Sequence, residues 1–204
     1  MKLSNLDIVS GLGGFALAAQ MVGGIKTQQF VEINQFCQKV LAKNFSGVPI
    51  HEDITTFTTK RRFDLVTGGF PCQDISSANV AGEGLDGERS GLFYELIRIV
   101  RECRPRYIVL ENVSALLSKR SGRDMGAVLW ELSACGYDAE WSSVSACAMG
   151  APHTRERVFI VAHANRINVQ GMAFQQPFER QVQPTHHRAL PHVWSSNSIT
   201  SRVS

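Results

Sequence analysis

The sequence predicts an α/β fold with a mostly parallel sheet, helices on both faces of that sheet and a terminal antiparallel hairpin. Along the first 165 residues, short apolar runs bounded by turn residues alternate with helix-like stretches, which is typical of βαβ units. The chain has 204 residues, enough to bury one sizeable core, and 44% of them are hydrophobic while 19% are charged. This composition excludes a disordered or fibrous protein.

Each element follows from the local pattern of apolar and turn residues. The expected strands lie at 6–9, 28–31, 64–67 and 107–110, with a short element at 50–54. The expected helices lie at 15–22, 34–44, 91–102 and 125–135. In the third of these, one face collects Leu92, Leu96, Ile99 and Val100. The last elements, 141–145 and 158–162, are separated by a loop with Gly150 and Pro152, which predicts a hairpin.

The apolar pattern ends near residue 165, where we place a domain boundary. Residues 1–165 form the predicted catalytic domain, and 166–204 form a polar tail without a second core. The tail contains four arginines and one acid, Glu179, which leaves 17 basic and 17 acidic residues in the first 165. The predicted domain is therefore neutral and lacks the broad positive surface that gives non-specific affinity for nucleic acid.

Cysteine usage and hydropathy place the protein in the cytoplasm. The five cysteines are an odd number and include no Cys-x-x-Cys pair, so the sequence indicates neither a disulfide framework nor a metal site. Cys37, Cys103, Cys135 and Cys147 are expected to be inert free thiols. No apolar run approaches the roughly 18 residues of a membrane span, and the first residues are too polar for a signal peptide.

A glycine turn after the first strand indicates a nucleoside site. The segment Ser10–Gly14 joins a strand to a helix, where backbone can approach a ligand closely. Glu32, at the end of the second strand, lies near the distance of about 20 residues at which an acid accepts ribose hydroxyls. Asp53 is placed similarly after the short third element. Because the third glycine of a dinucleotide turn is missing, a single nucleoside fits better, although a purely structural turn and solvated acids remain alternatives.

A cysteine and an acid follow the next two strands. Cys72 ends a glycine-containing loop, and Pro71 restricts Phe70 to an extended conformation. Glu111 ends the fifth strand, and ligands of open parallel sheets lie beyond the carboxyl ends of the strands. We therefore expect a nucleophile beside a carboxyl group at this edge. The alternative for Glu111 is a solvated acid near a helix start.

Six segments in this order resemble the conserved blocks of the DNA cytosine-5 methyltransferases, and the resemblance covers roughly residues 5–163. The segments are Asp7–Phe15, Val31–Ile33, Glu52–Ile54, Gly69–Gln73, Glu111–Val113 and Arg155–Val158. The resemblance implies a Rossmann-like fold that binds S-adenosylmethionine. The cofactor-binding residues it implies are Gly11, Leu12, Gly13, Gly14, Phe15, Glu32, Ile33, Asp53, Ile54, Pro71 and Leu92.

The resemblance also implies the catalytic roles. The thiolate of Cys72 adds to carbon 6 of cytosine, and this addition makes carbon 5 nucleophilic. Glu111 binds the exocyclic amine and the ring nitrogen at position 3, while Arg155 and Arg157 supply positive charge. Because the target atoms are inaccessible in double-stranded DNA, the cytosine is flipped out of the duplex, and the loop 74–90 closes over it.

The sequence also departs from the family pattern. Val9 stands where the family usually has Phe, and His153 stands where it usually has Gln. The target-recognition domain and the final family motif have no counterpart, so we expect a C-terminally truncated catalytic domain whose 166–204 tail is the start of the recognition region. A complementary polypeptide that carries the missing part could restore activity, and the expected protein partner is either this polypeptide or a restriction endonuclease.

Three other functions remain open. A non-catalytic remnant would bind cofactor or partner proteins only. A nicotinamide-dependent dehydrogenase would explain the glycine turn but leaves the later segments without a role. An RNA-methylating relative is conceivable, but nothing in the Cys72 loop indicates it.

Overall fold

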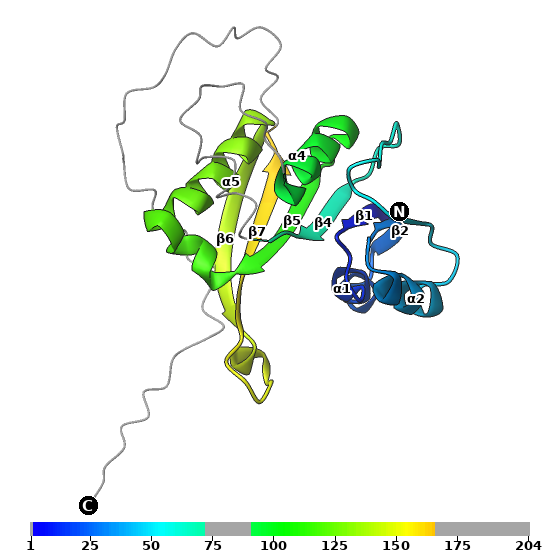
Figure 1. The fold of residues 1–204 in the computed structure, drawn as a ribbon, viewed down its shortest axis with the longest axis horizontal. Helices are drawn as coiled ribbons and strands as arrows, with labels where there is room; N and C mark the ends of the chain where they lie inside the picture. The colour runs from blue at the N-terminus through cyan, green and yellow to red at the C-terminus, as the bar shows by residue number, and fades with distance from the viewer. Residues whose placement is uncertain (1, 72–90, 166–204) are drawn as a thin grey trace, which may run out of the picture. The chain divides into compact units, whose positions relative to one another are not determined.

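The computed structural model describes residues 2–71 and 91–165, and within them the chain forms a mixed seven-stranded sheet (Figure 1). The strands are β1 (Leu3–Ile8), β2 (Ile25–Val31), β3 (Ile50–His51), β4 (Leu65–Gly69), β5 (Tyr107–Val113), β6 (Tyr137–Ser145) and β7 (Glu156–Ala164). The α-helices are α1 (Gly14–Val22), α2 (Gln35–Asn44), α4 (Leu92–Cys103) and α5 (Arg123–Ala134). Short 3₁₀ helices lie at Ser114–Leu117, Lys119–Gly122 and Cys147–Met149.

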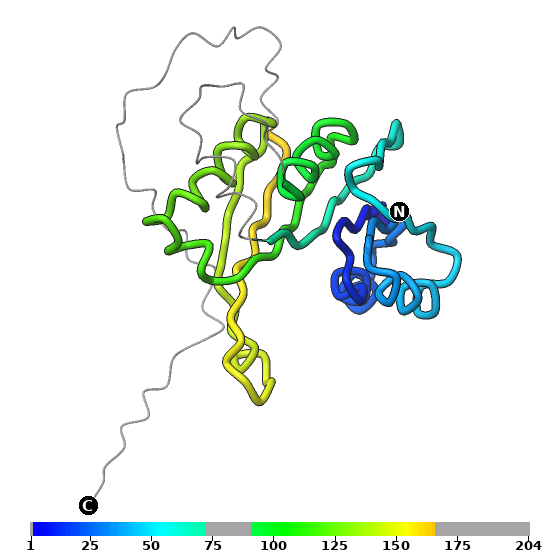
Figure 2. Tube along the Cα trace, viewed as in Figure 1, coloured from blue at the N-terminus to red at the C-terminus, as the bar shows by residue number. Residues whose placement is uncertain are grey.

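The strand order is β3-β2-β1-β4-β5-β7-β6, and the first five strands in the chain run parallel. β7 is antiparallel to both β5 and β6, so the predicted terminal hairpin is confirmed, and its tip extends away from the helices (Figure 2). Because β1 to β5 are parallel, their ends lie at one edge of the sheet, which we call the carboxyl edge. The site residues predicted at the carboxyl ends of these strands therefore lie at this edge.

Helices cover both faces of the sheet, and an apolar cluster lies on each face. Neighbouring residues of β2 separate the clusters, since Phe30 packs with Leu41 and Phe45 of the α2 region while Val31 joins the main core. The main core also contains the face of α4 predicted from the periodicity, with Leu96, Ile99 and Val100 fully buried. Figure 1 shows α4 and α5 over the half of the sheet with β5, β7 and β6, and α1 and α2 beside β1 and β2.

Several elements differ in extent from the prediction. β1 ends at Ile8 because Val9 takes a positive φ of 53°, which a β-branched residue rarely adopts in a strand. β6 starts at Tyr137 rather than 141, because its pairing with β7 runs without interruption from Tyr137 opposite Ala164. In the first half of β6, Tyr137, Ala139 and Trp141 alternate with two acids, so the alternation typical of a strand begins before the predicted start.

One part of the fold is incompletely covered by the described residues. On β5 and β7, Val109 and Phe159 are only partly buried, and Val161 on the same face is 46% exposed. Helix α1 has no charged residue, yet Met21 and Val22 are more than three-quarters exposed. Parallel sheets are normally covered on both faces, and a helix that is apolar all round is normally buried. This apolar surface, which we call the open face, thus has the character of a contact surface.

The helices of the described residues are also too short or too polar to cross a membrane.

Candidate active site

The turn between β1 and α1 requires glycine at position 13. After Val9, both Gly11 and Gly13 have positive φ, 54° and 88°. A Cβ atom at Gly13 would lie 2.6 Å from the Phe45 ring, closer than carbon atoms approach in proteins. The conformation brings the turn and the start of α1 against α2 and leaves its backbone N–H groups at the carboxyl edge.

Glu32 connects this turn to the turn that follows β2. Its side chain is 5% exposed, and its two carboxylate oxygens accept hydrogen bonds from the N–H groups of Gly11 (2.7 Å) and Asn34 (2.8 Å). A carboxylate oxygen can accept more than one hydrogen bond, so both oxygens keep capacity for a further donor. The residue type and its place at the end of β2 are therefore compatible with binding of two ribose hydroxyls.

The end of β3 brings a second acid to the same edge. Asp53 accepts hydrogen bonds from the N–H and the hydroxyl of Thr55, both at 2.8 Å, and these bonds lower the pKa of the Asp53 carboxyl group. The next residue, Ile54, is buried in the main core, whereas Ile33 after β2 is 73% exposed. Of the two isoleucines predicted near an adenine, Ile33 is thus the one with a free side-chain surface.

The ends of β4 and β5 hold the predicted acid beside an arginine. Glu111 is paired with Gly69, and a Cβ at Gly69 would lie only 3.1 Å from Glu111 Oε2. Arg157 Nε lies 2.6 Å from Glu111 Oε1, and both side chains are about one-quarter exposed. The arrangement leaves Glu111 reachable from solvent while the guanidinium fixes its orientation.

The predicted site residues do not all converge. Arg155 is exposed and forms no ion pair within the described residues, so the structure joins only Arg157 to Glu111. Phe15 packs edge-on against Phe159, with ring centres 6.5 Å apart, and Leu92 packs against the main core. Other predicted residues vary in exposure, since Leu12 and Gly14 are exposed, Gly11 is half-buried and Pro71 is exposed. Cys72 and the loop 74–90 lie outside the described residues, so the predicted contact between Cys72 and Glu111 stays a prediction.

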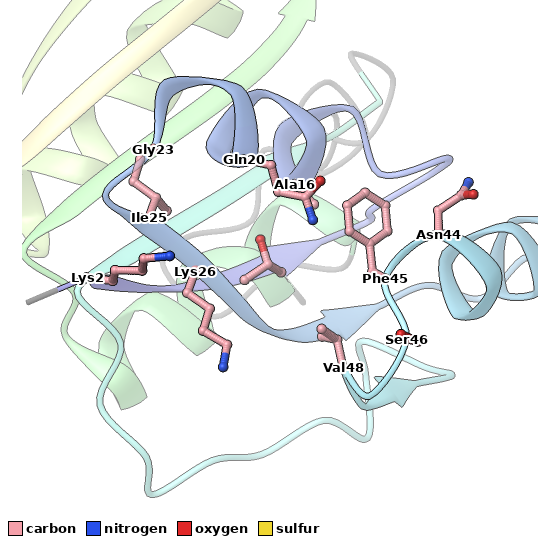
Figure 3. Close-up of a pocket in the computed structure, with 11 residues that line it drawn as sticks. Lys2, Ala16, Gln20, Gly23, Ile25, Lys26, Asn44, Phe45, Ser46 and Val48 are labelled. Atoms are coloured by element: carbon pink, nitrogen blue, oxygen red, sulfur yellow. The ribbon is translucent and has the colours of Figure 1, made fainter.

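A cavity of about 440 Å³ lies elsewhere, at the opposite edge of the sheet (Figure 3). Its lining includes Lys2 and Ile25, at the starts of β1 and β2, and Phe45 after α2. None of the predicted site residues lines it. Within the described ranges, no group of three or more His, Cys, Asp or Glu side chains could hold a metal ion.

Comparison with known proteins gives the same family as the motifs. The family model for C-5 cytosine-specific DNA methylase matches residues 3–200, nearly the whole chain. The chain belongs to the C-5 cytosine-specific DNA methylase family.

Members of this family that resemble the chain include bacterial type II methyltransferases. The chain is 37% identical over 161 residues to M2.BsuMI of Bacillus subtilis, which covers 77% of this chain and 41% of that protein. It is 32% identical over 176 residues to M.HhaI of Haemophilus parahaemolyticus, covering 85% of this chain and 53% of that protein. The chain thus spans about half the length of the curated relatives it matches.

Solved structures agree with the fold that the methylase family implies. A DNA modification methyltransferase encoded within an E. coli prophage has 26% identity and a TM-score of 0.65, over 80% of this chain and 47% of that chain. The Dnmt2 methyltransferase of S. pombe, at 21% identity, has a TM-score of 0.60 over 87% and 51% of the two chains. The predicted methyltransferase-like α/β fold is confirmed.

Sequence reasoning missed two buried polar residues next to the candidate site. Asn112 is buried, and its amide group donates a 2.8 Å hydrogen bond to the carbonyl oxygen of Phe70, two residues before Cys72. Asp7 is also fully buried and accepts a hydrogen bond from Thr67 at 2.9 Å. Asn112 stands inside the Glu111–Val113 segment, directly after the acid at the strand end, and this position is the signal that the sequence offers. The partner of Asp7 lies 60 residues away, and no local pattern indicates it.

Proposed function

We propose that this chain provides the catalytic half of an enzyme that transfers a methyl group from S-adenosylmethionine to carbon 5 of cytosine in DNA. The observation that carries the proposal is the Glu111–Arg157 pair, at 2.6 Å, beside Gly69. The same carboxyl edge of the sheet carries Glu32 and the glycine turn. The carboxyl edge thus carries both Glu111, which suits contact with a nucleobase, and Glu32, which suits contact with a ribose.

The chain's own residues fit an adenosine-containing cofactor. Glu32 would bind the ribose hydroxyls, and the N–H groups of the glycine turn would approach the amino acid part of the cofactor. Ile33 and Asp53 would flank the adenine, with the backbone of Ile54 between them and the core. When bound, S-adenosylmethionine supplies a methyl group on a positively charged sulfur. We assign the remaining predicted contacts to Gly11, Leu12, Gly13, Gly14, Phe15, Pro71 and Leu92.

In the proposed reaction, the thiolate of Cys72 forms a bond to carbon 6 of a flipped cytosine, and the electron pair moves to carbon 5. Glu111 donates a hydrogen bond or proton to the ring nitrogen at position 3 and thereby stabilises the developing charge. Carbon 5 would then form a bond to the methyl group, and the electron pair of the broken methyl–sulfur bond would stay on the sulfur of S-adenosylhomocysteine. A base removes the carbon 5 proton, and the returning electrons expel the thiolate. Arg157 keeps Glu111 oriented during these steps, and Arg155 remains a proposed contact to the base.

Residues 1–165 lack the excess of positive charge that supports binding to DNA phosphates. The first 165 residues have no net charge, so electrostatic attraction to phosphates is weak. We propose that a complementary polypeptide, equivalent to the other half of the relatives, supplies the recognition surface and docks on the open face. The exposed Met21, Val22 and Val161 support this docking. We also propose a cytoplasmic location, a restriction endonuclease as partner, and residues 166–204 as the start of the recognition region.

Methyl transfer from radiolabelled S-adenosylmethionine to duplex DNA tests the proposal. The chain is assayed alone and after mixing with the C-terminal half of a relative, with Cys72→Ala as the control. We expect DNA-bound label from the mixture and none from the mixture containing Cys72→Ala. Equal DNA-bound label from the wild-type mixture and from the Cys72→Ala mixture would overturn the enzymatic proposal. Binding of S-adenosylhomocysteine without any transfer would instead favour a non-catalytic, cofactor-binding module.

A further inference from the structure

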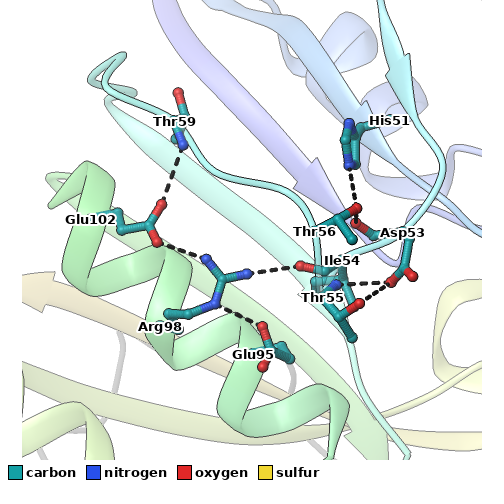
Figure 4. A network of polar contacts seen from close by, with 9 residues as sticks. All are labelled: His51, Asp53, Ile54, Thr55, Thr56, Thr59, Glu95, Arg98 and Glu102. Atoms are coloured by element: carbon teal, nitrogen blue, oxygen red, sulfur yellow. Dashed lines mark hydrogen bonds and ion pairs between the residues drawn. The ribbon is translucent and has the colours of Figure 1, made fainter.

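Arg98, on the exposed side of α4, uses its guanidinium to contact three acceptors (Figure 4). Nε lies 2.7 Å from Glu95 Oε2, and Nη1 lies 2.6 Å from Glu102 Oε1. These two ion pairs are local, since the partners are three residues before and four residues after Arg98 on the helix. Nη2 donates a 2.8 Å hydrogen bond to the carbonyl oxygen of Ile54, which is 44 residues away in the chain.

The contact with Ile54 ties α4 to the turn that follows β3. Within that turn, the carbonyl oxygen of Asp53 accepts hydrogen bonds from the N–H groups of Thr56 (3.3 Å) and Phe57 (3.1 Å). The side chain of Asp53 accepts from Thr55. In the hydrogen bonds of the described residues, the carbonyl of Ile54 is held from outside the turn, by Arg98.

A second contact holds the same segment to α4 further along. Glu102 accepts a 3.2 Å hydrogen bond from the N–H of Thr59 with its second oxygen, while the first oxygen binds Arg98. The segment 53–59 is therefore attached to one helix face at two points, and Arg98 takes part in both. The helix is a firm support because Phe93, Leu96 and Ile97 on its other side are completely buried.

The turn also has contacts with the core and with β3, since Ile54 and Phe57 bury their side chains in the main core and His51 Nε2 lies 3.0 Å from Thr56 Oγ1. β3 contains only two residues and pairs with β2 at Phe30–Ile50 and Val31–His51. It lies at the edge of the sheet, so no further strand fixes the residues that come after it. Beside the core packing of Ile54, the hydrogen bond from Arg98 on α4 therefore holds the backbone next to Asp53.

We propose that Arg98 is a positioning residue for the adenine end of the cofactor site. The inference rests on the proposed function, because it takes Asp53 and Ile54 as neighbours of the adenine. Arg98 does not touch the ligand. It sets where the Asp53–Ile54 backbone stands, and thereby the affinity for adenosine-containing ligands.

Arginine suits this role because it has three separate donor groups in one plane. A lysine would keep the charge, but its single ammonium group has no fixed fork with which to hold two carboxylates and a carbonyl together. Arg101 offers a matched control on the same helix, since its Nη2 lies 2.9 Å from Glu131 Oε2 on α5. Arg101 makes a comparable ion pair but has no hydrogen bond to the 53–59 segment among the described residues.

Calorimetric titration of the full chain with S-adenosylhomocysteine tests the inference. The variants are Arg98→Met, Arg98→Lys and the control Arg101→Met, each with a urea unfolding curve. We expect Arg98→Met to weaken binding about tenfold and Arg98→Lys by a smaller factor, while Arg101→Met stays within about twofold of the wild type. A loss of the same size is expected for 5′-methylthioadenosine, because the change lies at the adenine end of the site.

Hydrogen exchange supplies a readout that a general loss of stability would not give. The amides of residues 53–59 should exchange faster in the Arg98 variants than in Arg101→Met at equal overall stability. Should Arg98→Met fail to fold, Arg98→Lys carries the test. Unchanged affinity in a folded Arg98 variant would overturn this inference alone. Absence of binding by the wild-type chain would overturn the proposed function, and this inference with it.

Discussion

Asp7 is a carboxyl group buried without full hydrogen bonding. Its Oδ1 accepts from Thr67, whereas Oδ2 has no donor among the described residues. Burial raises the pKa of Asp7 from 3.8 to about 7, and the nearby charge of Glu32 adds to the rise against the opposing effect of Thr67. The folded state thus binds a proton more tightly than the unfolded state. The stability gained from this proton is complete below about pH 3.8 and is lost as the pH rises through 7.

We therefore expect Asp7→Asn to remove a pH dependence of unfolding. From pH 5 to pH 8, the free energy of unfolding of the wild type should fall by about 2–3 kcal/mol relative to the variant. Urea unfolding at both pH values measures this difference, and all other titrating groups are shared by the two proteins. If the free energy of unfolding changes with pH by the same amount in the wild type and in the variant, Asp7 is ionised in the folded state.

Arg157 orients Glu111, and its replacement should affect the reaction more than cofactor binding. Arg157→Lys removes the short Nε contact to Glu111 but keeps a positive charge. A hydrogen bond between charged groups contributes about 1.5–3 kcal/mol, so we expect a fall in methyl transfer of roughly 10- to 100-fold. Initial rates in the mixture of the two halves measure the effect, with Arg101→Lys on α4 as the control. A normal rate would mean that Glu111 needs no help from Arg157.

At this scale, sequence reasoning finds residues whose role follows from their place at a strand end. Glu32 and Glu111 could be located because parallel strands end at one edge. The burial of Ile54 and the hydrogen bond from Arg98 to the Ile54 carbonyl could not be predicted from the sequence. Both depend on how α4 packs against a segment 44 residues earlier. Arg155 and Arg157 are equivalent in the sequence, and only their positions at the start of β7 separate them.

Among the elements, the turn into α1 requires glycine at position 13. Gly13→Ala would combine a positive φ with contacts of 2.6 Å to Phe45 and 2.9 Å to Leu41. We expect a loss of about 2–4 kcal/mol in the free energy of unfolding, since backbone strain and overpacking each cost about 1–3 kcal/mol. Gly14→Ala is the matched control, because no atom lies within 4 Å of its Cβ position and the helix favours alanine.

Urea unfolding of the two alanine variants makes this comparison direct. A Gly13→Ala protein as stable as Gly14→Ala would contradict the tight turn.

Elements with a strong amphipathic pattern, such as α4, could be predicted to within a residue or two at each end. The predicted start of the edge strand β6 is four residues late, although Tyr137, Ala139 and Trp141 alternate with acids, and its full extent follows from its pairing with β7.

For the whole molecule, the order of the strands decides which chain segments share the site. The segments that follow β1, β2 and β3 carry most of the proposed cofactor contacts, whereas the proposed catalytic groups come from the segment after β4, the end of β5 and the start of β7. The alternation of strands and helices in the sequence predicts the parallel sheet, but not that β7 lies between β5 and β6. That insertion is what places Arg157 beside Glu111.

Titration of the full chain with S-adenosylhomocysteine, comparing Glu32→Gln with Glu140→Gln, tests the central claim most directly. Glu140 is an exposed acid on β6, so its change alters the charge equally without touching the carboxyl edge. We expect saturable binding of one ligand per chain, weakened about tenfold or more by Glu32→Gln and unchanged by Glu140→Gln. Wild-type affinity in a folded Glu32→Gln protein would contradict a nucleoside site at the ends of β1 and β2.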